Sequence, residues 1–273
     1  MKPFENVLIC TDLDGTLLGS DHVVSQENLE AIARFQAGGG YFTFVTGRMP
    51  SCVTEIYETV RPNAPFGCIN GGGLYDGAAK RYIYTHALDR DVLELVHCAM
   101  DALPDVGMQI DTFENIYFCR ENSAMEWFRE VTGMPNLTAR PDEVDEPFAK
   151  IVFGDRDPSH IDELIACLAK HPKAERFDFV RSERTLYEIL PKGINKGSVL
   201  PRLAQHLGIP MSRVVALGDY NNDVEMLRAA GVGIAVANAV PEAKAAADRV
   251  TVSNDEHAIA RVIAEIEDGT LSL

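Results

Sequence analysis

The sequence is poor in basic residues, with 25 Lys and Arg against 41 Asp and Glu and a formal net charge of −16. A surface of this sign repels nucleic-acid phosphates and anionic membranes, so we expect neither as a partner. It also repels small phosphorylated ligands. A ligand of that kind must therefore be attracted by a local cluster of positive groups.

The spacings that mark zinc sites and disulfide frameworks are also missing. None of the six cysteines lies in a C-x-x-C pair, and none of the seven histidines lies in an H-x-x-x-H or H-E-x-x-H pattern. We therefore expect buried free thiols and no zinc centre. No uncharged run approaches the ~18 residues of a transmembrane helix. Glu5 and Asp12 bracket a hydrophobic run too short for a signal peptide, so the sequence predicts a cytoplasmic protein.

Strand-like and helix-like runs alternate at both ends of the chain. The 273 residues, 46% of them hydrophobic, are enough for two domains. The alternation predicts a parallel sheet covered by helices on both faces. One helix is predicted at 26–37, with an inner face made of Leu29, Ile32, Ala33 and Gln36. The strands predicted for this sheet are 7–10, 41–45, 213–217, 232–236 and 249–252.

The middle of the chain has a different pattern. It begins with a predicted strand at 81–86, continues in α+β order, and returns through the turn residues Leu190-Pro191-Lys192-Gly193. We expect an α/β protein with a doubly wound, Rossmann-like parallel-sheet core over 1–82 and 190–273. An α+β cap domain is inserted into this core at 83–189.

Two carboxylates follow the first predicted strand, in the run Asp12-Leu13-Asp14-Gly15-Thr16. Ligands bind at the carboxyl ends of strands in open α/β sheets, and alternate residues of extended backbone can face the same space. The two acids repel each other unless a cation lies between them or one of them stays protonated. The motif therefore indicates Mg²⁺, an acid/base pair, or both.

Three further polar motifs follow in order along the chain. Thr46-Gly47-Arg48 comes after a predicted strand, and Lys196 lies in Gly193-Ile194-Asn195-Lys196-Gly197 ahead of a helix. Gly218-Asp219-Tyr220-Asn221-Asn222-Asp223 follows another strand. At these motifs the chain resembles the haloacid dehalogenase superfamily of phosphohydrolases, and specifically its Cof-type sugar-phosphatase branch. The likeness covers both ends of the chain, whereas the middle matches only in length and layout.

The resemblance implies catalytic roles for four residues. It places the nucleophile at Asp12, whose carboxylate would form an aspartyl-phosphate and divide one slow hydrolysis into two steps. Asp14 would protonate the leaving alkoxide and then deprotonate the attacking water. Thr46 offers a hydroxyl, and Lys196 a compact positive charge, to the phosphoryl oxygens.

The same motifs predict a magnesium site. Mg²⁺ prefers oxygen ligands from one or two carboxylates, for which Asp12 and Asp219 are the expected pair, and the resemblance adds the backbone carbonyl of Asp14. Asp223 either binds the metal through water or orients Lys196. The alternative is that Asp219 caps a helix and Asp223 lies in a solvated first turn.

Further residues are candidates for substrate binding beside Thr46 and Lys196. Arg48 either contacts the substrate phosphate or pairs with a surface carboxylate. Specificity should come from the inserted domain, where the run Arg181-Ser182-Glu183-Arg184 either reaches the substrate or is merely solvated. The candidates in the core are Gly47, Arg48, Asn70, Asn195 and Asn222.

Together the motifs predict an Mg²⁺-dependent phosphatase that hydrolyses small phosphorylated metabolites, such as hexose phosphates, through an aspartyl-phosphate. A phosphomutase is one alternative, because it could use the same nucleophile and return the phosphoryl group to a sugar. A non-enzymatic phospho-accepting switch module is another, although such modules are typically half this length. The expected partner is a small phosphate monoester, and the sequence makes no prediction of the oligomeric state.

Overall fold

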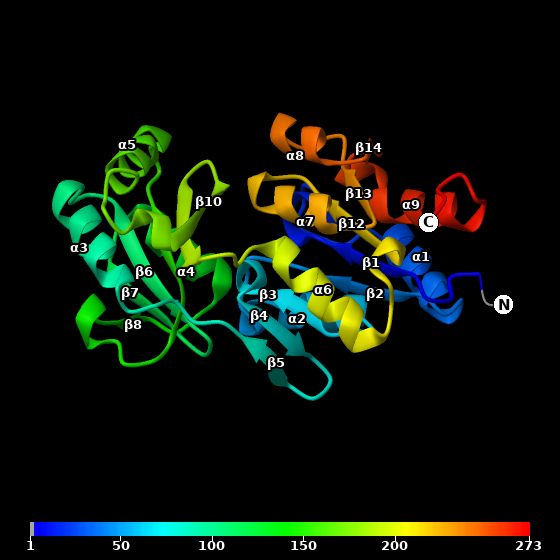
Figure 1. Ribbon diagram of the computed structural model, residues 1–273, viewed down its shortest axis with the longest axis horizontal. Coiled ribbons are helices and arrows are strands. Elements are labelled where there is room, and N and C mark those ends of the chain that lie inside the picture. Colours follow the sequence, from blue (N-terminus) through cyan, green and yellow to red (C-terminus); the bar gives the residue numbers. More distant parts are fainter. Residues whose placement is uncertain (1–2) are drawn as a thin grey trace. The chain divides into compact units, whose positions relative to one another are not determined.

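The polypeptide leaves its first structural unit once and later returns to it, as Figure 1 shows. The computed structural model describes residues 3–273. The core unit runs up to Tyr84 and resumes over Asn195–Leu273, and the cap unit is Thr85–Ile194. The insertion predicted from the sequence, 83–189, begins and ends slightly earlier than this cap unit.

A five-stranded sheet with the order β14-β13-β12-β1-β2 forms the centre of the core unit. All of its strand pairs are parallel, as the alternation of strands and helices predicted. The chain runs from β1 to β2 on one side and continues with β12 on the other. The carboxyl end of β1 is therefore the point where the strand order reverses, which is where ligands bind in such sheets. The strands are β1 Leu8–Thr11, β2 Tyr41–Phe44, β12 Val214–Gly218, β13 Val232–Ala235 and β14 Arg249–Val250.

Helices cover both faces of this sheet (Figure 1). Leu8 and Cys10 of β1 pack in one buried cluster with Leu200 and Leu203 of α6, which therefore covers the face to which these alternate side chains point. On the opposite face α1 packs against α9. Right-handed crossovers between parallel strands produce this division. The helices of the core unit are α1 Gln26–Ala37, α2 Thr54–Val60, α6 Lys196–Leu207, α7 Val224–Ala229, α8 Pro241–Ala246 and α9 Ala258–Glu267.

Helix α1 has its predicted bounds but a different buried face. The Ser25 hydroxyl accepts a hydrogen bond from the Asn28 N–H and caps the helix. The buried residues are Asn28, Ala31, Ile32 and Phe35, whereas Ala33 of the predicted inner face is exposed. The large ring of Phe35 decides the orientation, because it removes more apolar surface from water than Ala33 does.

A small antiparallel sheet with the order β3-β4-β5 was only partly predicted. Its middle strand β4, Gly73–Asp76, was not predicted and pairs with β3, Phe66–Cys68. The predicted strand at 81–86 is β5, Arg81–Thr85, and it joins this sheet instead of the sheet of the insertion. Pairing with β4 decides its place, because only the turn 77–80 separates β5 from β4.

The cap unit is built on a six-stranded sheet with the order β10-β11-β9-β6-β7-β8. Helices α3 and α5 pack on one face through a buried apolar cluster that includes Ile110, Ile151 and Ile189. The unit therefore has a hydrophobic core of its own. Its strands are β6 Gly107–Thr112, β7 Ile116–Arg120, β8 Leu137–Thr138, β9 Phe148–Gly154, β10 Phe177–Glu183 and β11 Leu186–Pro191. Its helices are α3 Val92–Ala102, α4 Ser123–Thr132 and α5 Pro158–Leu168.

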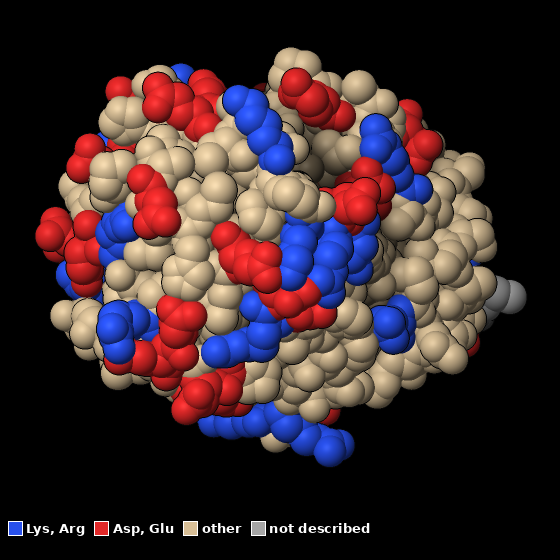
Figure 2. All heavy atoms as spheres, turned by 60° about the vertical axis from the view of Figure 1, so that its left-hand side comes forward, with Lys and Arg blue, Asp and Glu red and all other residues tan. Residues whose placement is uncertain are grey.

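The charged residues are mixed by sign on the surface. Figure 2 shows Lys and Arg side chains lying among Asp and Glu side chains over one face. The excess of acid is therefore not gathered into one continuous patch there. Within residues 3–273, no helix is both long and apolar enough to cross a bilayer.

We expect Leu164→Ala to lower the free energy of unfolding by about 2–5 kcal/mol, because Leu164 is fully buried in the apolar cluster under α5. Urea unfolding followed by circular dichroism measures this change. The neighbouring exposed residue gives a control, Glu163→Ala, which should change stability by less than about 0.5 kcal/mol. Equal losses in the two variants would contradict a separate cap core.

Candidate active site

Three polar residues meet at the carboxyl edge of the core sheet. Asp12 follows β1, Thr46 lies just beyond β2, and Asp219 follows β12. The Asp12 N–H donates to the Leu217 carbonyl over 2.9 Å and so continues the pairing of β1 with β12. Adjacent parallel strands thus bring together residues that are far apart in the sequence.

A buried lysine joins two of the acids. The Nζ of Lys196 lies 2.7 Å from Asp12 Oδ1 and 2.6 Å from Asp223 Oδ1, and the Lys196 side chain is 1% exposed. Burial alone would lower the pKa of Lys196, but the two carboxylates outweigh burial and raise it. Lys196 is therefore a fixed positive charge beside the Asp12 carboxylate.

The carboxylates of Asp12, Asp219 and Asp223 form a cluster whose oxygens lie within 4.8 Å of one another. Burial, followed by repulsion from Asp223, raises the pKa of Asp12 well above its usual range and that of Asp219 to about 7. A cation at this position would relieve the repulsion. An all-oxygen set with few carboxylates fits Mg²⁺, so the residues present fit a divalent ion.

Asp219 and Asp223 have different surroundings. Asp219 Oδ1 accepts a hydrogen bond from Thr16 Oγ1 at 2.8 Å, and Tyr220, not Asp219, is the N-cap of the following turn. Asp223 Oδ2 accepts from the N–H groups of Asp219 and Tyr220 at 2.9 and 3.0 Å, and its other oxygen faces Lys196. These contacts favour Asp219 as a direct metal ligand and Asp223 as the residue that orients Lys196.

Asp14 lies outside the acidic cluster and pairs with Arg48. Arg48 Nε is 2.9 Å from Asp14 Oδ2, and Arg48 Nη2 is 2.5 Å from Asp14 Oδ1. Of the two roles predicted for Arg48, the structure thus shows pairing with a carboxylate, and that carboxylate belongs to the site. Asp14 is 45% exposed in its side chain, so a ligand can reach it.

The backbone just after Asp14 needs a glycine at position 15. Gly15 has φ +79°, and a Cβ there would lie 2.6 Å from Asp219 Oδ2. The Asn238 side chain donates to the Gly15 carbonyl at 2.7 Å. A larger residue would therefore push the first motif away from Asp219.

Thr46 is held beside the second motif. Its Oγ1 accepts a hydrogen bond from the Arg48 N–H at 3.1 Å, which leaves the hydroxyl hydrogen to be donated. Gly47 keeps the chain close to Asn70, because a Cβ on Gly47 would lie 3.1 Å from Asn70 Oδ1.

A strained corner at Ile69-Asn70-Gly71 connects the second, third and fourth motifs. The φ angles of these residues are +54°, +51° and +93°, a costly conformation for the first two because they carry side chains. The N–H groups of Ile69 and Asn70 donate to the carbonyls of Arg48 and Thr46. A Cβ on Gly71 would lie 2.1 Å from the Asn195 carbonyl oxygen. The corner therefore packs against the start of α6.

The three asparagines predicted to bind substrate have protein partners in this structure. Asn222 Nδ2 donates to Asn70 Oδ1 at 3.2 Å. The Asn195 side chain accepts from the Ser198 N–H at 3.0 Å and caps α6. These contacts stabilise the backbone around the site. Direct contact of the three asparagines with substrate stays a prediction.

Two contacts at the site were missed from the sequence, those of Thr16 and Asn238. Thr16 lies inside the first motif, so its position was a signal that could have found it. In the cap unit, Arg181 pairs with Asp162 at 2.7 Å. Arg181, the first residue of the charged run 181–184, is therefore paired with a carboxylate of its own unit.

The family model of haloacid dehalogenase-like hydrolases matches residues 9–263. The chain belongs to this family. YxeH of Bacillus subtilis (strain 168) is 32% identical over 272 residues, which are 95% of this chain and 97% of that protein. The 5-amino-6-(5-phospho-D-ribitylamino)uracil phosphatase YitU of the same organism is 27% identical over 270 residues, covering 97% of each chain.

Solved structures of the family have the same architecture. The subclass IIB sugar phosphatase BT4131 superposes with a TM-score of 0.83 at 22% identity, covering 97% of this chain and 100% of its own. This likeness confirms the predicted α/β core with an inserted cap. The protein is a haloacid dehalogenase-type phosphatase, a phosphoric monoester hydrolase of small metabolites. The family implies a divalent metal, and the acidic cluster fits one.

We expect Gly71→Ala to reduce phosphatase kcat/KM roughly 10- to 100-fold, because the new Cβ would collide with the Asn195 carbonyl and displace the corner. Gly133→Ala is the matched control, since Gly133 has φ +63° and open space around it. That control should lose only about 1–2 kcal/mol of stability and keep its activity. Steady-state kinetics and urea unfolding separate the two effects, and an active Gly71→Ala enzyme would contradict this role of the corner.

We also expect Mg²⁺ binding to depend on pH. With its pKa raised to about 7, Asp219 keeps a proton in the metal-free protein that the unfolded chain has already lost. The stability that this carboxyl contributes therefore falls as the pH rises from about 4 to 7. Mg²⁺ must displace this proton, so its apparent affinity should rise by at least about tenfold per pH unit below 7.

Isothermal titration calorimetry in buffers of different ionisation enthalpy tests this dependence, because it counts the protons released on binding. The series should extend on both sides of the pKa of Asp219. A flat affinity profile without proton release would show that Asp219 is ionised before the metal arrives.

Proposed function

We propose that the protein is an Mg²⁺-dependent phosphatase of sugar phosphates and related polyol phosphates, acting through an aspartyl-phosphate on Asp12. The observation that carries this proposal is the placement of the Asp12 carboxylate. It lies at the carboxyl edge of the sheet, 2.7 Å from the Lys196 ammonium and within the acidic cluster. A carboxylate with a fixed cation beside it suits attack on an anionic phosphoryl group.

The proposed reaction has two steps. In the first, an Asp12 oxygen attacks phosphorus, the bond from phosphorus to the substrate oxygen breaks, and Asp14 gives its proton to the leaving alkoxide. In the second, Asp14 takes a proton from water, and the resulting hydroxide displaces Asp12 from phosphorus. Inorganic phosphate leaves, and both carboxyl groups return to their starting states. Arg48 holds Asp14 in place through its two hydrogen bonds.

Lys196 and Thr46 would stabilise the charge on the phosphoryl oxygens. Lys196 is the stronger contributor, because its charge is buried and held by two carboxylates. Asp12 and Asp219, with the Asp14 carbonyl, would hold Mg²⁺, while Asp223 orients Lys196. When bound, the ion would supply positive charge that stabilises the negative charge of the phosphoryl group.

The substrate class is inferred from two relatives. BT4131 is described as a sugar phosphatase, and YitU by its name acts on a phosphorylated ribityl chain. Sugars and ribityl groups are both polyhydroxylated carbon chains. We therefore propose a phosphate ester of such a chain as the substrate. The cytoplasmic location stays a prediction from the sequence.

The experiment that tests the proposal is phosphate release from a panel of metabolites, with and without Mg²⁺. The panel should contain hexose and pentose phosphates, sugar alcohol phosphates, 5-amino-6-(5-phospho-D-ribitylamino)uracil and nucleotides. Highest kcat/KM for a nucleotide would overturn the proposed substrate class. Transfer of the phosphoryl group between sugar positions, without release of phosphate, would favour the phosphomutase alternative.

We expect Asp12→Asn to reduce kcat at least about 10³-fold with the fold intact, because the amide fills the same volume but is not a nucleophile. Asp101→Asn, on an exposed part of α3, is the matched control and should remain fully active. Appreciable turnover by Asp12→Asn would refute the role of the nucleophile.

Chelation by EDTA should abolish the activity of the wild-type enzyme, and added Mg²⁺ should restore it.

A further inference from the structure

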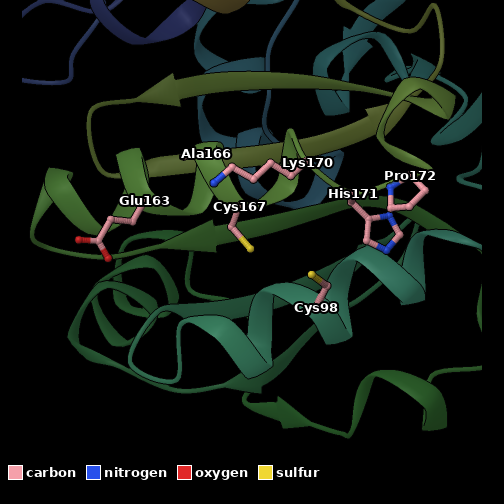
Figure 3. Close-up of a pocket in the computed structure, with 7 residues that line it drawn as sticks. All are labelled: Cys98, Glu163, Ala166, Cys167, Lys170, His171 and Pro172. Atoms are coloured by element: carbon pink, nitrogen blue, oxygen red, sulfur yellow. The ribbon is translucent and has the colours of Figure 1, made fainter.

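A cavity of about 520 Å³ opens on the surface of the cap unit between α3 and α5. It lies within one unit and shares no residue with the acidic cluster of the core. Figure 3 shows two of its side chains, Cys98 from α3 and Cys167 from α5, with their sulfur atoms pointing toward one another. The residues that line the cavity are Cys98, Glu163, Ala166, Cys167, Lys170, His171 and Pro172.

The two sulfur atoms point toward one another, and both thiols are partly exposed to solvent. Burial and the neighbouring Cys98 raise the pKa of Cys167, while the Lys170 ammonium acts in the opposite direction. A thiol with a raised pKa is slow to attack a peroxide, so Cys167 suits the resolving role. Helices α3 and α5 pack against each other, so side-chain rotation can bring two facing sulfur atoms to bonding distance.

We propose that Cys98 and Cys167 form a reversible oxidation site, at which a small hydroperoxide converts the two thiols into a disulfide that links α3 to α5. The cavity gives the peroxide access to both sulfur atoms. Cys98 is the attacking thiol and Cys167 the resolving one. This site is separate from the phosphatase reaction.

The chemistry balances with the peroxide as the oxidant. The Cys98 thiolate attacks one peroxide oxygen, the O–O bond breaks, and an alcohol or water leaves, so that Cys98 becomes a sulfenic acid. The Cys167 sulfur then attacks the Cys98 sulfur and displaces hydroxide, which leaves as water with the proton of Cys167. Two thiols lose two electrons, and the peroxide gains them.

Three of the other cysteines are poor targets for the same reagent. Cys10 and Cys68 are fully buried in the core unit, and burial raises the pKa of both thiols. Burial also raises the pKa of Cys119 to about 12, and its thiol donates to the Tyr117 carbonyl at 3.5 Å. Thiolates react with peroxides and thiols do not, so oxidation should favour the pair in the cavity.

The disulfide would close a long loop of the cap unit. Helices α3 and α5 cover the same face of the cap sheet, but most of that sheet's strands lie between them in the sequence. A crosslink across so many residues restricts the unfolded chain strongly. The oxidised cap should therefore unfold at a higher temperature than the reduced cap.

The test is treatment of the full-length protein with hydrogen peroxide, followed by peptide mapping under non-reducing conditions. We expect one crosslink between the Cys98 and Cys167 peptides, with a loss of about 2 Da that dithiothreitol reverses. The melting temperature should rise on oxidation and return on reduction. Crosslinks between other cysteines would overturn the proposal. So would oxidation of Cys98 and Cys167 to sulfinic or sulfonic acids without a disulfide.

Single variants test the order of attack. Cys167→Ser should accumulate a sulfenic acid on Cys98, which dimedone traps, whereas Cys98→Ser should trap far less on Cys167. Equal trapping in the two variants would refute the assigned order. Cys52→Ser is the matched control, because Cys52 is partly exposed in the core unit, and this variant should still form the crosslink. A peroxide-induced melting shift that persists in Cys98→Ser would contradict the crosslink as its cause.

Discussion

The buried ion pairs of Lys196 are the interaction on which the rest of the site depends. One ammonium group joins Asp12 at the end of β1 to Asp223 at the start of α7, from the first turn of α6. Removing one partner of such a buried pair leaves an uncompensated charge and costs about 3–5 kcal/mol. The triad of Lys196, Asp12 and Asp223 therefore fixes the position of three chain segments. It also keeps the Asp12 carboxylate beside a cation.

The backbone around the triad is packed so closely that side chains are excluded at several positions. Gly15 lies against Asp219, and Gly71 lies against the Asn195 carbonyl. The strained corner Ile69-Asn70-Gly71 is held by hydrogen bonds to the loop that follows β2. Strain of this kind persists only where its surroundings hold it. The same contacts that hold this corner in its strained conformation also bring the loop after β2 close to the start of α6.

The division into two units places the proposed chemistry in one of them. The core unit contains every residue that the proposed reaction uses, whereas the cap unit has its own sheet and its own apolar cluster. Substitutions in the cap therefore leave the triad in the core undisturbed. This arrangement explains how relatives named for different substrates share one architecture.

The sequence by itself determined the parallel core, the inserted unit and the four motifs, because alternating hydrophobic runs and short polar motifs are local patterns. It also placed Asp12, Asp219 and Lys196 in one site. Only the tertiary structure decided that Arg48 pairs with Asp14, that Asn195 caps α6 and Asn222 bonds to Asn70, and that β5 joins β4. Those outcomes depend on distances between residues far apart in the chain, and no local pattern encodes such distances.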